Sequence, residues 1–125
     1  MTRRYIRCAV AVLASAAVAA CAGRSPERAE ALGDHYLSVE QYDRAADNYA
    51  CVVNEWPWRY DAHLGLGKAL IGSGHADQAR THLEIAYTQR PNDTEAIETL
   101  AEAMFQSGDK AGMSRFLSKR AQERQ

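Results

Sequence analysis

The sequence predicts an all-α fold of six antiparallel helices, arranged as three tandem helix-turn-helix units behind an N-terminal signal peptide. Two observations predict the helices. Small and apolar residues recur every 34 residues without insertion or deletion, and no segment shows the strict alternation that marks a β-strand. A third observation, a basic start followed by an apolar run, predicts the signal peptide. A repeat of this length is typical of a two-helix unit that buries its apolar side only by stacking on its neighbours.

The repeat is clearest between Ala62 and Pro91, and its residues match others 34 positions earlier and later. The matched sets are Leu32-Gly33, Leu66-Gly67 and Leu100-Ala101; Tyr36, Leu70 and Met104; Ala45, Ala79 and Met113; Tyr49, Leu83 and Leu117; and Pro57 with Pro91.

These positions resemble the signature of the tetratricopeptide repeat (TPR) family, in which Leu-Gly, an aromatic, a small residue, a second aromatic and a closing proline follow one another at fixed spacing. The leading aromatic place holds Ala29 in the first copy and His63 in the second, and the third copy departs from the pattern at Ala101 and Met113. The resemblance covers Pro26 to Gln125. It implies a short right-handed solenoid at residues 27–125, with repeats at about 26–59, 60–93 and 94–125.

Breaks at proline, glycine and short polar stretches divide this region into helices. We expect helices at about residues 27–39, 42–54, 59–72, 76–89, 94–106 and 110–123. Asp93 and Asp109 precede the fifth and sixth helices, where their carboxylates would accept hydrogen bonds from free backbone N–H groups.

The small residues of the repeat have a packing role. Gly33, Gly67 and Ala101 would let the two helices of a pair approach closely, and Ala45 and Ala79 would do the same from the second helix. Larger side chains at these positions would overpack the contact. Gly65 to Lys68 superficially resembles a phosphate-binding loop, but Ala62 and Ala69 stand where that motif needs Gly and Ser or Thr. Close helix packing explains these glycines better.

Residues 1–20 read as a signal peptide, with Arg3, Arg4 and Arg7 before an apolar run from Cys8 to Ala20. The run is too short to span a bilayer as a helix. It ends in Val18-Ala19-Ala20-Cys21, which resembles the lipobox of bacterial lipoproteins. The resemblance implies cleavage before Cys21 and lipidation of its sulfur; the alternative is an ordinary Ala-x-Ala cleavage site beside a chance cysteine.

Lipidation of Cys21 would make it the N-terminus and anchor the chain stably in a membrane. Residues 21–26 would be the lipidated cysteine and a short tether, and five extended residues reach only about 17 Å. Ala22 stands where the inner-membrane retention signal of such lipoproteins has Asp. The expected location is therefore the periplasmic face of the bacterial outer membrane.

Charge and cysteine content limit the partners further. The whole chain has 15 basic and 16 acidic residues, and loss of the three early arginines leaves 12 against 16, or −4. A mildly acidic domain is a poor nucleic-acid binder, because phosphates are bound by clustered Lys and Arg. With Cys8 removed and Cys21 lipidated, only Cys51 remains, so we expect no intramolecular disulfide. Cys51 is then either a small half-buried residue or the site of an intermolecular disulfide.

In the TPR family the first helices of successive repeats line a concave groove that binds ligands. Carried over by position, the groove residues here are Glu27, Glu30, Asp34, Leu37, Asp61, Leu64, Lys68, Ile71, Glu95, Glu98, Glu102 and Phe105. Seven of these residues are carboxylates and one is a lysine, so the resemblance implies an acidic groove with an apolar strip. Such a groove favours a basic or amphipathic segment of another protein. The alternative is that these are ordinary solvated helix faces.

Two further regions are candidate contact surfaces. Trp56, Trp58 and Tyr60 flank Pro57 at the junction of the first two repeats, where they either wedge between helix pairs or stay exposed for a partner. In the last helix some apolar residues would be left uncovered beside a basic side, which could meet the acidic groove of a second copy. The apolar residues are Met113, Phe116 and Leu117, and the basic ones are Arg115, Lys119, Arg120 and Arg124.

No pattern indicates catalysis or a cofactor. His35, His63, His75 and His82 match no metal-binding spacing, and no nucleophile stands beside an oriented base. We expect an envelope scaffold or assembly factor without enzymatic activity, for a pilus or secretion system by resemblance to lipid-anchored TPR proteins such as those of the Tad/Flp pilus and the pilotins. The alternatives are a self-associating structural protein and an adaptor in outer-membrane or cell-wall assembly.

Overall fold

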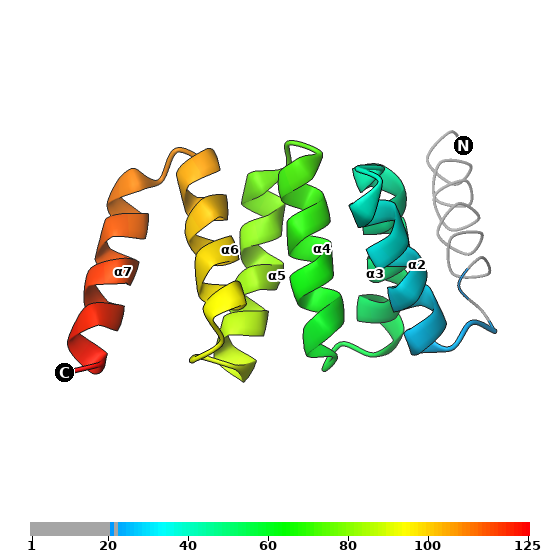
Figure 1. Ribbon diagram of the computed structural model, residues 1–125, viewed down its shortest axis with the longest axis horizontal. Helices are drawn as coiled ribbons and strands as arrows, with labels where there is room; N and C mark the ends of the chain where they lie inside the picture. Colours follow the sequence, from blue (N-terminus) through cyan, green and yellow to red (C-terminus); the bar gives the residue numbers. More distant parts are fainter. Residues whose placement is uncertain (1–20, 22) are drawn as a thin grey trace, which may run out of the picture.

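The computed structural model describes residue 21 and residues 23–125, so the expected signal peptide at 1–20 lies outside the described residues. Regular structure in the described part consists of six α-helices. They are α2 (Pro26–Ser38), α3 (Tyr42–Glu55), α4 (Tyr60–Gly72), α5 (Ala76–Gln89), α6 (Thr94–Gln106) and α7 (Lys110–Glu123). The helices run alternately up and down in a row, with α2 and α7 at opposite ends (Figure 1). The predicted all-α solenoid is confirmed, and no expected helix boundary differs by more than one residue.

Side-chain caps set several of these boundaries. Asp93 and Asp109 cap α6 and α7 as predicted, accepting from the backbone N–H groups of Glu95 and Gly112 respectively. Ser25 caps α2 in the same way, with Pro26 in the first turn, where a missing N–H costs nothing. The capped helices therefore begin where the sequence supplies an oxygen acceptor.

The turn inside each helix pair has the same backbone conformation in all three repeats. Glu40, Gly74 and Gly108 stand 34 residues apart, and their φ angles are 58°, 84° and 83°. Glycine takes this left-handed conformation without strain, whereas Glu40 adopts it against a steric penalty. The repeat thus extends to the turn geometry, although only two of its three copies have the favoured residue.

Close approach of the paired helices depends on glycine, as predicted. A Cβ on Gly33 would lie 2.6 Å from the Tyr49 ring, and a Cβ on Gly67 would lie 2.4 Å from Leu83. Gly65 makes the corresponding contact between repeats, because a Cβ there would lie 2.4 Å from Tyr49. The ring of Tyr49 therefore fills a space that two glycines leave open, one in α2 and one in α4.

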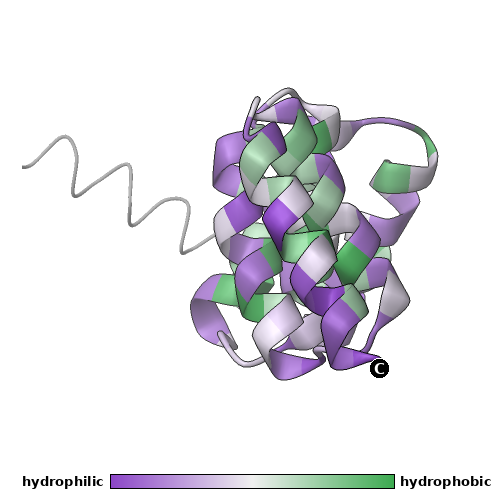
Figure 2. Cartoon of the chain, turned by 90° about the vertical axis from the view of Figure 1, so that its left-hand side faces the viewer, coloured by the Kyte–Doolittle hydropathy of each residue, from purple (hydrophilic) through white to green (hydrophobic). Residues whose placement is uncertain are grey.

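The core runs along the stack as three clusters. The largest joins α4, α5 and α6 through Leu64, Leu83 and Leu100, and smaller clusters lie between α2, α3 and α4. Seen from the C-terminal side, hydrophobic and hydrophilic stretches alternate along the ribbons, as expected for helices with one apolar face (Figure 2).

Candidate binding groove

The predicted groove residues lie on the first helices of the three pairs, α2, α4 and α6, but they do not all reach the surface. Leu64 and Ile71 are only 6% and 8% exposed and belong to the core between repeats. The prediction of an apolar strip through them is wrong, because the next helix pair covers this side of α4. Leu37 is partly buried, whereas Phe105 is 53% exposed and is the large apolar side chain that the predicted set leaves accessible.

An arginine that the prediction missed neutralises the groove at its α2 end. Arg59, just before α4, donates to Glu30 through Nε and Nη2, each at 2.7 Å, and its Nη1 lies 3.0 Å from Glu27. The bidentate hydrogen bonds to Glu30 raise the pKa of Arg59, and the charges of Glu30 and Glu27 raise it further; partial burial of the guanidinium opposes this shift but does not reverse it. The pKa of Glu27 is lowered, first by a backbone hydrogen bond and then by Arg59. These two carboxylates thus join the first repeat to the second.

Two more predicted carboxylates have partners inside the protein. Asp34 accepts a short hydrogen bond from the hydroxyl of Tyr49, whose pKa is raised by burial and by that carboxylate. Lys68 forms an ion pair with Glu95, which links α4 to α6 across the concave side. Both pairs hold repeats or helices together, which leaves less charge for a ligand.

Three predicted carboxylates remain, one on α4 and two on α6. Asp61, Glu98 and Glu102 are exposed, and within the described part of the chain none of them has a basic side chain at ion-pair distance. Glu102 accepts a hydrogen bond from Gln106 at 3.0 Å. Glu98 and Glu102 stand four residues apart and therefore share one face of α6.

A hollow of about 600 Å³ adjoins these residues. It is lined by Tyr42, Lys68, Ile71, Gly72, Thr99, Glu102 and Gln106. Four of these residues, Tyr42, Gly72, Thr99 and Gln106, were not predicted as groove residues, and Tyr42 comes from α3, the second helix of the first pair. The signal for it was Gly72 at the end of α4, where a Cβ would lie 2.3 Å from the Tyr42 ring.

Known protein families contain this arrangement of helix pairs around a groove. Two models described as tetratricopeptide repeat match the chain, one at residues 36–86 and one at residues 64–112. Together they span more than half of it. The chain belongs to the tetratricopeptide repeat family. TPR proteins are generally scaffolds for protein-protein interaction and not enzymes.

Individual relatives agree with this assignment. The chain is 29% identical to human tetratricopeptide repeat protein 21A over 72 residues, which cover 58% of this chain and 6% of the human protein. Among solved structures, MamA MSR-1 superimposes with a TM-score of 0.71 at 27% identity, covering 82% of this chain and 59% of MamA. MamA AMB-1 gives the same TM-score at 28% identity, over 78% of this chain and 58% of MamA. The chain thus spans less than two thirds of the length of these relatives.

The aromatic residues at the first TPR junction divide between the two predicted roles. Trp56 packs against Ala29, Val52 and Ala62, so it wedges between the first pair and α4. Tyr60 is buried in the core, and the guanidinium of Arg90 lies 4.0 Å over its ring. Trp58 is 68% exposed. Only Trp58 is therefore available as a contact residue.

The last TPR helix is less exposed and less basic than predicted. Met113 and Phe116 pack against the core, and the Phe116 ring meets Tyr87 edge-on at 5.1 Å. Arg120 is buried, with its guanidinium 5.7 Å over the Tyr87 ring, so it does not belong to a basic surface. Leu117 is 41% exposed. Arg115, Lys119 and Arg124 are the exposed basic residues of the predicted set.

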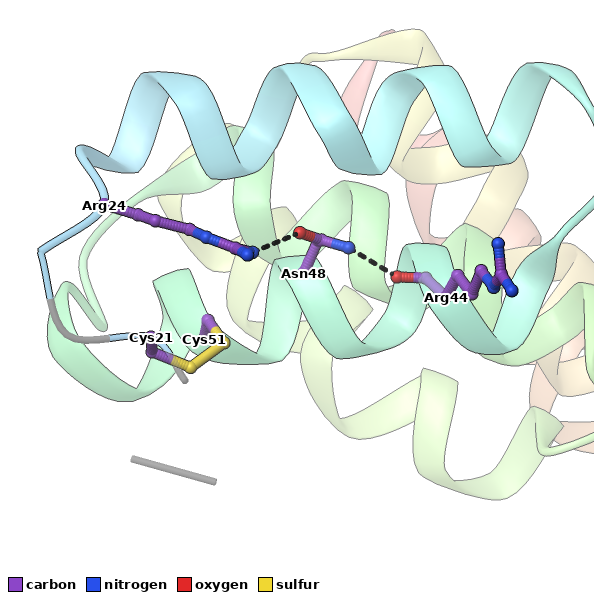
Figure 3. The surroundings of a disulfide bond; sticks show 5 residues. All are labelled: Cys21, Arg24, Arg44, Asn48 and Cys51. Carbon is purple, nitrogen blue, oxygen red and sulfur yellow. Dashed lines mark hydrogen bonds between the residues drawn. A yellow bond between two sulfur atoms is a disulfide. The ribbon is translucent and has the colours of Figure 1, made fainter. Parts of the chain in front are cut away.

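The pairing of the cysteines differs from the prediction. Cys21 and Cys51 form an intramolecular disulfide with a Cα–Cα distance of 5.6 Å, although none was expected (Figure 3). The prediction was wrong because it assigned the Cys21 sulfur to a lipid and ignored that Cys51, on α3, lies beside the start of the domain. A sulfur in a disulfide cannot also carry a lipid. The predicted lipidation of Cys21 would require the chain without this disulfide.

Two histidines form a hydrogen-bonded pair in the second TPR, of which His63 is buried and His82 is partly buried. Nε2 of His63 lies 2.7 Å from the carbonyl oxygen of Pro57 and must donate to it, so Nδ1 of His63 accepts from Nδ1 of His82 at 3.2 Å. Burial, and then the neighbouring His63, lowers the pKa of His82. Among the described residues no group of three or more His, Cys, Asp or Glu could hold a metal ion. None of the described helices is long and apolar enough to cross a membrane.

Proposed function

We propose that this TPR protein is a scaffold of the bacterial envelope whose groove binds a basic or amphipathic segment of another protein at its α6 end. The observation that carries the proposal is the uneven charge of the groove. Arg59, Tyr49 and Lys68 engage the carboxylates of α2 and Glu95, whereas Glu98 and Glu102 have no basic partner in the described chain.

The chemistry of this end favours a cationic ligand with an apolar neighbour. A Lys or Arg side chain could lie between Glu98 and Glu102, since two carboxylates four residues apart on one helix face can contact the same cation. Phe105, one turn beyond Glu102, offers exposed ring surface, and Tyr42 lines the adjoining hollow. Charge would then guide the encounter, and the aromatic contacts would slow dissociation.

We place the scaffold at a membrane through Cys21. The lipobox-like Val18-Ala19-Ala20-Cys21 and the few residues before α2 would hold the domain close to the periplasmic face of the outer membrane. Within the envelope we favour assembly of a pilus or secretion system, by resemblance to lipid-anchored TPR proteins of such machines. This step rests on family analogy.

The first experiment is crosslinking in intact cells followed by identification of the captured proteins. Wild type is compared with a Glu98→Lys, Glu102→Lys double variant, which reverses the charge of the α6 end. The control is Asp43→Lys, Asp47→Lys, which makes the same change at the same spacing on α3, where both carboxylates are also exposed. We expect the groove variant alone to lose a pilus or secretion component. Equal capture by all three proteins would exclude the groove as the binding site.

Self-association is the second candidate, and the exposed side of α7 favours it. Leu117 and Arg124 are exposed and stand seven residues apart, which places them on one side of α7 and its C-terminal end, and this side could contact the acidic end of another copy's groove. Light scattering of the purified protein at rising concentration tests it. A protein that stays monomeric at every concentration would exclude it.

A further inference from the structure

Two residues before α2, Cys21 and Arg24, contact α3 through a covalent bond and a hydrogen bond (Figure 3). The Cys21–Cys51 disulfide joins residues 30 apart in sequence. Nη1 of Arg24 donates to Oδ1 of Asn48 at 3.4 Å, and Asn48 donates in turn to the carbonyl oxygen of Arg44 at 2.8 Å. Cys51 and Asn48 stand three residues apart on α3, so both hold the same segment from one helix face.

We propose that Cys51 competes with lipidation for the sulfur of Cys21, so that the chain exists in two mutually exclusive covalent forms. In the anchored form the Cys21 sulfur carries the lipid and Cys51 is a free thiol. In the other form the disulfide holds Cys21 on the first TPR and no lipid is attached. The inference rests on the proposed lipid anchoring, and it assigns Cys51 a role that packing alone does not require.

The two reactions consume the same atom. In lipidation the Cys21 sulfur forms a bond to a glycerol carbon of a phospholipid, the phosphate headgroup leaves with the electrons of the carbon–oxygen bond, and the thiol proton is released. In disulfide formation the thiols of Cys21 and Cys51 lose two protons and two electrons to the disulfide of a thiol-disulfide oxidoreductase, which becomes a dithiol. Neither product can undergo the other reaction, since neither keeps a thiol at Cys21.

The structure supplies what such a competition needs. A Cα–Cα distance of 5.6 Å lies within the range that a disulfide spans without backbone movement. Cys51 is only partly buried, so an oxidoreductase or a thiol reagent can reach this helix face. An envelope compartment outside the cytoplasm is also where disulfides persist.

The test uses the full chain, expressed in a bacterium that processes lipoproteins. Cells are quenched in acid, separated into membrane and soluble fractions, and labelled with a maleimide polymer before and after reduction; intact mass reports the lipid. We expect lipid-bearing molecules in the membrane fraction with Cys51 labelled without reduction. The molecules without lipid should label at Cys21 and Cys51 only after reduction, whichever fraction they are found in. Lipid and disulfide on the same molecule, or lipid-free molecules with both thiols labelled before reduction, would overturn the inference.

Variants separate this inference from the anchor itself. Cys51→Ser should lower the share of molecules without lipid, because Cys21 then has only the lipid as its product. Asn54→Ser, an exposed change three residues further along α3, should leave the distribution as in wild type. If lipid is found but Cys51→Ser changes nothing, the competition is wrong and the anchor stands. If neither wild type nor Cys51→Ser carries lipid and Cys21→Ser stays in the membrane fraction, the anchor is wrong and the competition falls with it.

Discussion

Leu83 and Leu117 occupy the same position of the TPR, in the second and third copies, yet their surroundings differ completely. Leu83 in α5 is 0% exposed, whereas Leu117 in α7 is 41% exposed. α5 packs against both α4 and α6, and α7 packs mainly against α6. The position within a repeat therefore does not determine burial by itself, because each helix of a solenoid is buried by the helices on either side of it.

Whole helices of the central and last repeats show the same contrast. Nine of the 13 residues of α4 are buried, whereas α7 has two buried residues among 14, Gly112 and Arg120. Segments with little buried apolar surface open with low free energies, and well-buried ones open only with the whole domain. We therefore expect α7 to open with a lower free energy than α4.

The largest expected difference comes from truncating the two equivalent leucines. Leu83→Ala should lower the free energy of unfolding by about 2–5 kcal/mol, since it leaves a cavity at a fully buried site. Leu117→Ala should change it by less than about 0.5 kcal/mol, because this leucine is already 41% exposed. Urea denaturation of both variants measures the two values. Equal losses would mean that α7 is covered in solution, by a second copy or another segment.

The next largest effect concerns the glycine that faces Leu83. Gly67→Ala raises helix propensity, yet it should destabilise the protein by about 1–3 kcal/mol, because the new Cβ would lie 2.4 Å from the leucine side chain. The third repeat already has Ala101 at this position. Ala101→Gly should cost only the propensity term of about 1 kcal/mol. Stabilisation by Gly67→Ala would show that Leu83 can move aside.

The sequence predicted the helices well because their signals are local: the period, the prolines and the capping carboxylates Asp93 and Asp109. It predicted the groove only in part, because exposure and pairing depend on residues far away in sequence. Leu64 and Ile71 follow the family's groove positions, but the neighbouring repeat buries them. Arg59 neutralises Glu27 and Glu30 from about 30 residues away.

The disulfide was missed for a related reason. Pairing of Cys21 with Cys51 is visible only once the segment before α2 has a direction, and that direction depends on where α3 lies. The lipobox-like sequence moreover predicted that the Cys21 sulfur carries a lipid. The number of cysteines does not decide whether the Cys21 sulfur is lipidated or forms a disulfide.

The smallest expected effect is a difference between the second and third repeats in how pH changes the free energy of unfolding. Burial, with His63 beside it, holds the pKa of His82 below its usual 6.5, so below that pH the unfolded chain binds a proton that the folded chain does not. Stability from this pair is complete above pH 6.5 and is lost as the pH falls through the lowered folded value. In the last repeat, the Gly112 N–H and then Arg80 lower the pKa of Asp109 from 3.8, so its contribution is lost only in much stronger acid.

Denaturation at several pH values between about 7.5 and about 5 isolates the histidine pair, because Asp109 stays ionised throughout. Wild type should lose stability across this window, and His82→Gln should be flatter, since it removes the group whose protonation burial opposes. The control is His35→Gln on α2, which makes the same change at an exposed histidine outside the pair. A His82→Gln protein with the full slope would show that another group couples folding to protons, and the histidine pair would then be a packing feature of the central repeat alone.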